Sequence, residues 1–251
     1  MNDKLERPAA SRSLPAMTAS LLRSMPVIVT VVLIIDTVLM NFLARYTILD
    51  LPWVAVNAAI FVSWIAFLLL DIITKHFGPE AANIVSIIAA ATNFFCSVVC
   101  YVICLIVKNP TLDALIGGQW SVFTASTLAF VISAVVNNYI NAFIGKLFVK
   151  KPDGKTAYAT RAFLSTFVSQ FVDNFLFLFF AFFIFPFLPS ALQVRWTMPQ
   201  ILVYALLCAI IELISEVIFA PIGYAVSKKW KEQNVGSEFI KKYYPKEAVQ
   251  E

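Results

Sequence analysis

The sequence predicts an all-α polytopic membrane protein with six transmembrane helices and both termini in the cytoplasm. The chain is 60% hydrophobic and only 14% charged, and its mean hydropathy is +0.82. A soluble domain of 251 residues does not need so much apolar surface. A membrane-spanning helix needs about 20 mostly apolar residues, and runs of about this length recur six times along the chain. The strands of an outer-membrane barrel would alternate apolar and polar residues, and these runs do not.

The six apolar runs follow one another with short connections. In chain order they cover residues 26–46, 52–74, 82–107, 119–146, 161–188 and 199–227. Each is expected to be helical, because lipid offers no partner to a free backbone group. The first run is too long for the core of a signal peptide, so we expect it to remain as a span. The chain then divides into an N-terminal cytoplasmic tail, a membrane domain and a C-terminal cytoplasmic tail, at residues 1–25, 26–228 and 229–251.

The basic residues predict the orientation of the spans. Of the 19 lysines and arginines, all but Arg45, Lys108 and Arg195 lie in the two tails and in the connections that follow the second and fourth runs. Arg161 is counted here, at the end of the fourth connection. By the positive-inside rule these segments are cytoplasmic, which requires an even number of spans. The net charge of +4 is therefore a topology signal, and we expect no nucleic-acid partner.

Cysteine and histidine give no indication of a metal or redox centre. The four cysteines lie inside predicted spans, and Cys96, Cys100 and Cys104 recur on one face of the third. A metal site would need deprotonated thiolates with further ligands nearby, so small packing residues are the favoured interpretation. The chain has no nucleophilic triad, no glycine-rich phosphate loop and no cluster with metal-ligand spacing. We therefore expect no cofactor, no metal and no enzymatic activity.

Two neighbouring spans carry the same polar motif. SAVVNNYINAF at 133–143 and SQFVDNFLFLF at 169–179 share the pattern Ser-x-x-Val-Asn/Asp-Asn-Tyr/Phe-Ile/Leu-x-x-Phe. Copies on consecutive spans point in opposite directions, so the fourth and fifth spans are expected to be related as an inverted repeat. Many secondary transporters build a solute site at such a repeat. The alternative is that Ser and Asn only join two helices, as they often do in membrane bundles.

Ionisable residues inside the spans point to the same region. Each costs on the order of 3 kcal/mol to insert, so each is a functional hypothesis by default. The five such residues are Asp36, Asp71, Asp173, Glu212 and Glu216. Glu212 and Glu216 stack four residues apart on one helix face. Two stacked carboxylates in a low dielectric resist joint ionisation, so we expect the pair to hold a proton.

Helical spacing gathers the polar residues of the last three spans into stripes that we expect to face one cavity. The residues expected to bind a solute there are Ser133, Asn137, Asn141, Thr166, Ser169, Gln170, Asp173, Asn174, Glu212 and Glu216. Carboxylates and amides without a fixed cation disfavour an anionic solute. They suit a cation or a neutral molecule rich in N–H donors, such as a guanine-like base.

Several segments resemble one membrane family. DIITKHFG at 71–78, TASTLAFVISAVVNNY at 124–139, RAFLSTFVSQFVDNFLFLFFAF at 161–182 and EVIFAPIGYAV at 216–226 are similar to motifs of the queuosine precursor transporter family, also called the vitamin uptake transporter family. The resemblance covers roughly residues 26–230. It implies a six-helix, multi-pass importer of the bacterial inner membrane for 7-deazaguanine bases, which carry the N–H edge of guanine.

The resemblance also implies roles for single residues. Gln170 and Asp173 would lie at the edge of the base, and Asp71 and Thr74 near a cytoplasmic gate, while Asn41 matches an Asn late in the first span of the family. Three positions depart from the pattern. The fourth-span Gln and Asp of the family are here Ala134 and Asn137, and a basic residue of the last span is Glu212. The site is therefore expected to be reshaped, toward another deazapurine, another heterocycle or an amine.

Three functional hypotheses follow. The first is a secondary transporter coupled to protons through Asp173 or the Glu212/Glu216 pair, or one that allows facilitated diffusion. The second is a solute-binding subunit that needs an energising partner, as in energy-coupling-factor transporters. An intramembrane enzyme is disfavoured, because nothing positions a nucleophile, metal or cofactor. The expected partners are a small-molecule solute and membrane lipid, and the sequence leaves a homodimer open.

Overall fold

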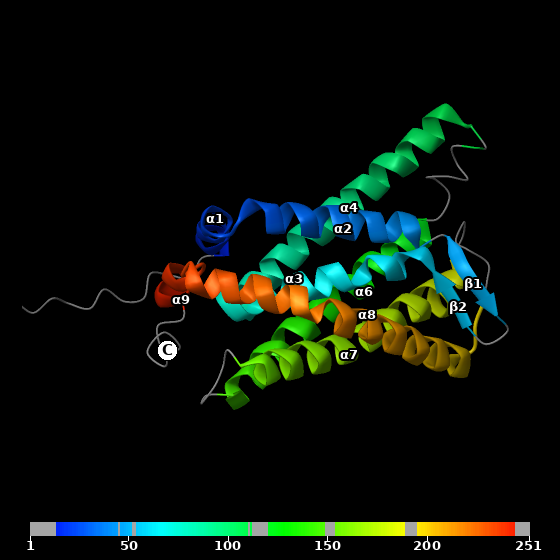
Figure 1. Ribbon diagram of the computed structural model, residues 1–251. Coiled ribbons are helices and arrows are strands. Elements are labelled where there is room, and N and C mark those ends of the chain that lie inside the picture. The colour runs from blue at the N-terminus through cyan, green and yellow to red at the C-terminus, as the bar shows by residue number, and fades with distance from the viewer. Residues whose placement is uncertain are drawn as a thin grey trace, which may run out of the picture.

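The computed structural model describes residues 14–44, 46–51, 54–109, 111, 120–148, 154–188 and 195–243. The chain forms a bundle of helices with one small hairpin (Figure 1). The first half contains α1 (Leu14–Ser24), α2 (Val27–Leu43), β1 (Thr47–Leu51), β2 (Val54–Asn57), the 3-10 turn η1 (Ala58–Phe61), α3 (Ser63–Phe77) and α4 (Pro79–Val107). The second half contains α6 (Trp120–Gly145), the 3-10 turn η2 (Lys146–Phe148), α7 (Lys155–Phe179), the π-helical turn η3 (Phe180–Ile184), the 3-10 turn η4 (Phe185–Phe187), α8 (Met198–Glu232) and α9 (Ser237–Tyr243).

The helices identify a multi-pass membrane protein. Within the described residues, α4, α6, α7 and α8, with their continuing turns, are each long and apolar enough to cross a bilayer. The pair α1 and α2, bent by 107° at their junction, passes the same test if the two are one span. The apolar runs predicted at 82–107, 119–146 and 199–227 correspond to α4, α6 and α8.

The expected helix over residues 52–74 is wrong in its first part. Residues 54–57 form strand β2, which pairs antiparallel with β1 from Thr47↔Asn57 to Leu51↔Val54, and α3 begins only at Ser63. β-branched residues such as Val54 and Val56 favour extended backbone. When the two strands pair, the backbone N–H and C=O groups of each strand find hydrogen-bond partners on the other. The 15 residues of α3 extend about 22 Å. This is less than the roughly 30 Å hydrocarbon core.

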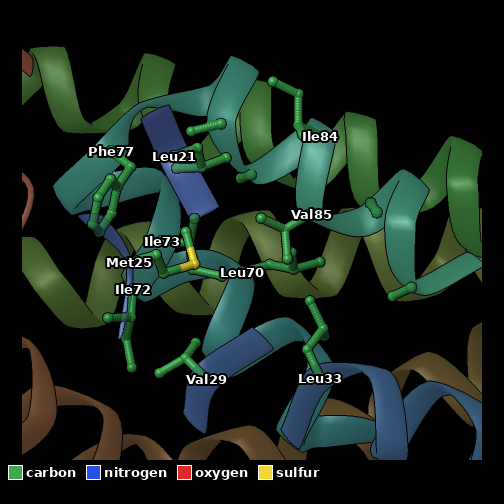
Figure 2. Packing of buried hydrophobic residues seen from close by; sticks show 14 of the residues in the cluster. Leu21, Met25, Val29, Leu33, Leu70, Ile72, Ile73, Phe77, Ile84 and Val85 are labelled. Carbon is green, nitrogen blue, oxygen red and sulfur yellow. The ribbon is translucent and has the colours of Figure 1, made fainter. Parts of the chain in front are cut away.

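The first four helices meet in an apolar core. Figure 2 shows Leu21 of α1 and Leu33 of α2 packed with Leu70 and Ile73 of α3 and Val85 of α4, all of them buried. The same cluster includes aromatic residues from the other end of the sequence, Trp230, Phe239 and Tyr243. The Tyr243 hydroxyl donates a hydrogen bond to the Ala16 carbonyl at 3.3 Å. Helices α1 and α9 therefore lie together at one end of the bundle, and the hairpin lies at the opposite end (Figure 1).

Helix α8 packs very closely against α3 and α7 near Gly223. A β-carbon built on Gly223 would lie 2.2 Å from the Tyr158 hydroxyl oxygen and 2.4 Å from Leu68 Cδ1. Only glycine leaves room for this approach, which brings the polar face of α8 within reach of the polar residues on α3 and α7.

Candidate transport site

The two copies of the repeated motif bond to each other reciprocally. The Ser133 hydroxyl of α6 donates to Asp173 Oδ1 of α7 at 2.7 Å. The Ser169 hydroxyl of α7 donates to Asn137 Oδ1 of α6 at 3.1 Å. The serine of each copy thus bonds the Asn or Asp of the other copy, which requires the two helices to run antiparallel.

The same register continues one turn further along α6 and α7. Asn141 Nδ2 donates to Ser165 Oγ at 3.4 Å, and Asn141 Oδ1 accepts Arg161 Nε at 3.3 Å and Nη2 at 2.8 Å. We call these α6–α7 contacts, from the Ser133–Asp173 bond to the Arg161–Asn141 bonds, the polar ladder.

Arg161 corrects one sequence-based expectation. The sequence places Arg161 in a cytoplasmic connection and predicts polar stripes that lack a fixed cation. Helix α7 instead begins at Lys155, and Arg161 is only 9% exposed at the end of the polar ladder. The apolar run alone placed the start of this helix too late, because its first turns are polar.

The second Asn of each copy bonds outward, to a different neighbour. Asn138 Nδ2 donates to Asn83 Oδ1 of α4 at 2.8 Å, and Asn138 Oδ1 accepts the Thr74 hydroxyl of α3 at 3.2 Å. The equivalent Asn174 donates through Nδ2 to Glu212 Oε2 of α8 at 2.7 Å. The first copy is therefore joined to α3 and α4, and the second to α8.

Two carboxylate clusters share residues with the polar ladder. The Asp173 cluster comprises Ser133, Asp173, Asn174 and Glu212, in which the charges of Asp173 and Glu212 are close enough to repel. The Ser63 hydroxyl, in the first turn of α3, lies close to Glu212.

The Asp71 cluster comprises Asp71, Asn137, Ser165, Tyr158 and Glu216. Asp71 Oδ1 accepts Asn137 Nδ2 at 2.8 Å and lies 3.4 Å from Ser165 Oγ. Asp71 and Glu216 are close enough for their charges to repel. Within the described residues, Asp71 Oδ2, both Glu216 oxygens and the Tyr158 hydroxyl are buried without a hydrogen-bond partner.

Two further predicted site residues are buried with unmade hydrogen bonds. Both side-chain atoms of the Gln170 amide and the Thr166 hydroxyl have no partner in the described part of the chain. A buried polar group left unpaired costs about 1–3 kcal/mol, and such groups are few in native proteins. Gln170 lies on the same face of α7 as Asp173 and Thr166, so this face presents donors and acceptors that a bound polar molecule can satisfy.

The remaining expected positions lie apart from the clusters. Asn41 donates through Nδ2 to the Thr37 carbonyl of its own helix at 3.4 Å. Asp36 is buried on α2 and faces the backbone N–H of Ala66, near the start of α3. In the described residues no group of three or more His, Cys, Asp or Glu side chains is arranged to hold a metal ion.

Sequence reasoning missed four residues of this region, namely Asn138, Tyr158, Arg161 and Ser165. The spacing contained a signal for two of them, since Arg161 and Ser165 precede Ser169 at four-residue intervals on the same helix face. The repeated motif contained a signal for Asn138, which is the equivalent of Asn174, whereas Tyr158 had none, because its neighbours come from α3 and α8.

Antiparallel apolar helices joined by buried polar side chains define a multi-pass membrane protein. A family model described as "Putative vitamin uptake transporter" matches residues 57–226, about two thirds of the chain. The protein therefore belongs to the vitamin uptake transporter family, the queuosine precursor transporter family, as the motifs indicated. No curated protein and no solved structure matches the chain.

Proposed function

We propose that the protein imports a small planar heterocycle, a 7-deazaguanine queuosine precursor or a related base, across the bacterial inner membrane. The observation that carries the proposal is the pair of carboxylates Asp173 and Glu212, which are close enough for their charges to repel, with the unpaired amide of Gln170 about one turn from Asp173 on α7. Family membership supports uptake of a small molecule.

The other copy of the repeat explains why the carboxylate pair suits a donor-rich solute. In the first copy, Asn137 supplies an N–H group to the Asp71 carboxylate at 2.8 Å. At the equivalent position of the second copy Asp173 has no N–H group to give, so Asp173 and Glu212 present acceptors to each other. The ring N–H and exocyclic amino groups of a guanine-like base would supply further donors to the two carboxylates, beside those of Ser133 and Asn174.

Gln170 would complete the recognition of the base. Its amide offers one acceptor and two donors, and neither end is used within the described residues. A hydrogen bond that involves a charged group contributes about 1.5–3 kcal/mol, so two carboxylate contacts would strengthen binding of a small solute by a factor of roughly 10²–10⁴.

The proposed topology has six crossings, with α2 and α3 as the two shorter ones and both ends of the chain in the cytoplasm. The adjacent positions of α1 and α9 at one end of the bundle support this arrangement, as do the basic tails. The membrane domain is proposed to cover residues 26–228. The reciprocal Ser133–Asp173 and Ser169–Asn137 bonds support an inverted-repeat relation between α6 and α7.

Calorimetry on the purified protein tests the solute. We expect 7-deazaguanine to bind the wild type, and Asp173→Asn and Glu212→Gln each to weaken it at least tenfold. Asp36→Asn is the matched control, because it neutralises another buried carboxylate outside the Asp173 cluster and should bind like the wild type. Binding of a small amine and of no guanine-like base would replace the assigned solute, and binding of neither would overturn the site.

Uptake into liposomes tests the mechanism. We expect the protein alone, with no second polypeptide, to accumulate 7-deazaguanine, and a protonophore to abolish that accumulation. Binding without uptake would instead identify a solute-binding subunit that needs an energising partner. Uptake that is unchanged by the protonophore would identify facilitated diffusion.

A further inference from the structure

Asp71 and Glu216 form a second pair of carboxylates with no role in the solute site proposed above. Asp71 lies on α3 and Glu216 on α8, and their side chains are 2% and 0% exposed. Of the four oxygens, only Asp71 Oδ1 has hydrogen-bond partners, and the other three have none within the described residues. An ionised carboxylate in such surroundings is costly unless it is paired and hydrogen-bonded.

The positive charge close to Asp71 and Glu216 does not balance two ionised carboxylates. From α7 it is faced by Arg161, which interacts with Asp71, and by the Tyr158 phenol. Helix α6 contributes the neutral amides of Asn137 and Asn141.

Further titratable groups lie on the two helices that carry the pair. Glu212 is one turn away on α8, and Lys75 and His76 lie about one turn beyond Asp71 on α3, where His76 Nε2 is 3.0 Å from Ser227 Oγ. With both carboxylates ionised, one guanidinium would have to neutralise two buried negative charges.

One bound proton would provide the missing hydrogen-bond donor and would also remove the excess negative charge. A carboxylic acid O–H donates a hydrogen bond that one of the unpaired oxygens can accept, and a single remaining charge is balanced by Arg161. Two carboxylates in one low-dielectric site commonly share a proton in this way. The proton binds and leaves by forming and breaking one O–H bond, and no bond to the solute is made.

We propose that Asp71 and Glu216 share one exchangeable proton and that this proton is the coupling ion for import. The coupling half of this proposal rests on the proposed function. The pair adjoins the solute site on two sides. Glu216 is one helical turn from Glu212, and Asn137 bonds both Asp71 and Ser169. Rearrangement around a bound solute therefore reaches the proton site directly.

Transport in liposomes tests the coupling, with radiolabelled 7-deazaguanine as the probe. Two rates are measured for each variant, namely solute exchange at equal pH on both sides and accumulation driven by an imposed pH gradient. We expect the ratio of accumulation to exchange to fall at least tenfold in Asp71→Asn and in Glu216→Gln. Asp36→Asn, a buried carboxylate on α2 away from the pair, should keep the wild-type ratio. An unchanged ratio in both pair variants, or accumulation driven by Na⁺ in place of protons, would overturn the proposal.

Infrared spectroscopy tests the proton without any solute. The wild-type protein at neutral pH should show a carboxylic acid C=O band that weakens in both Asp71→Asn and Glu216→Gln and persists in Asp36→Asn. A band that neither substitution affects would refute the shared proton. If 7-deazaguanine is not exchanged at all but the band behaves as expected, the assigned solute fails and the proton site stands.

Discussion

The two copies of the repeated motif differ at one position that contacts a neighbouring carboxylate, where the first copy has an amide and the second a carboxylate. Asn137 and Asp173 occupy equivalent positions, and each accepts a hydrogen bond from the serine of the other copy. The Asn137 amide also donates to a neighbouring carboxylate, Asp71. Asp173 meets the carboxylate of Glu212 with no donor of its own. Both ends of the Asn137 amide are thus bonded to protein groups, whereas Asp173 can only accept, so a donor-rich ligand can add hydrogen bonds to Asp173 and Glu212.

Making the first copy like the second should have the largest effect. Asn137→Asp replaces the N–H donor to Asp71 with a further buried carboxylate. Leaving a buried charge uncompensated costs about 3–5 kcal/mol. We expect a loss of unfolding free energy of that order, measured by denaturation in detergent micelles.

A double variant tests whether the lost Asn137–Asp71 hydrogen bond is the cause of this destabilisation. Asn137→Asp combined with Asp71→Asn exchanges the amide and the carboxylate and restores one donor to one acceptor. We expect the double variant to recover most of the lost stability. If it is no more stable than Asn137→Asp alone, the Asn137–Asp71 hydrogen bond is not the reason for the asymmetry.

Making the second copy like the first should weaken recognition of the solute. Asp173→Asn removes one of the two carboxylates proposed to accept from the ligand and places an N–H donor close to Glu212. The loss of a charged hydrogen bond, about 1.5–3 kcal/mol, corresponds to roughly 10–150-fold weaker binding of 7-deazaguanine, measured by calorimetry. Equal affinity in Asp173→Asn and wild type would contradict the assigned site.

Removing the unpaired buried amide of Gln170 should raise stability and lower solute affinity. Gln170→Leu has similar volume and leaves no donor or acceptor unmade. Because the unpaired amide costs about 1–3 kcal/mol, we expect the ligand-free variant to be more stable by about 1 kcal/mol, seen as a higher melting temperature. Its affinity for 7-deazaguanine should fall. A variant that is less stable than wild type would show that Gln170 has a structural partner.

The two serines provide a matched pair with the smallest expected effect. Ser133→Ala and Ser169→Ala each remove one of the reciprocal bonds between α6 and α7. Such bonds in membranes are worth about 0.6 kcal/mol on average, so both variants should lose a similar small amount of stability. Only Ser133→Ala, which removes a partner of Asp173, should change solute affinity. Equal effects on binding would break the distinction between the two copies.

The long apolar runs allowed the sequence to predict helices α4, α6 and α8 to within a few residues at most ends. Residues 52–57 were assigned to a helix because a short apolar run does not distinguish helix from strand. The polar stripes on α6 and α7 followed from four-residue spacing. Their register did not, because it depends on how the two helices pack. For the same reason the sequence placed Glu212 and Glu216 in one pair, whereas the structure sets each opposite a different aspartate.

The spacing of the polar ladder has a mechanical consequence. Because its groups recur every four residues on both helices, a slide of α7 along α6 by one turn, about 5.4 Å, finds new partners for most of them. In one direction Asn137 would come opposite Asp173, and Asn141 opposite Ser169. Packed helices can shift past one another by one turn, and the repeat of this interface offers two alternative registers for such a shift. Alternating exposure of a site to the two sides of a membrane needs a joint with two such registers.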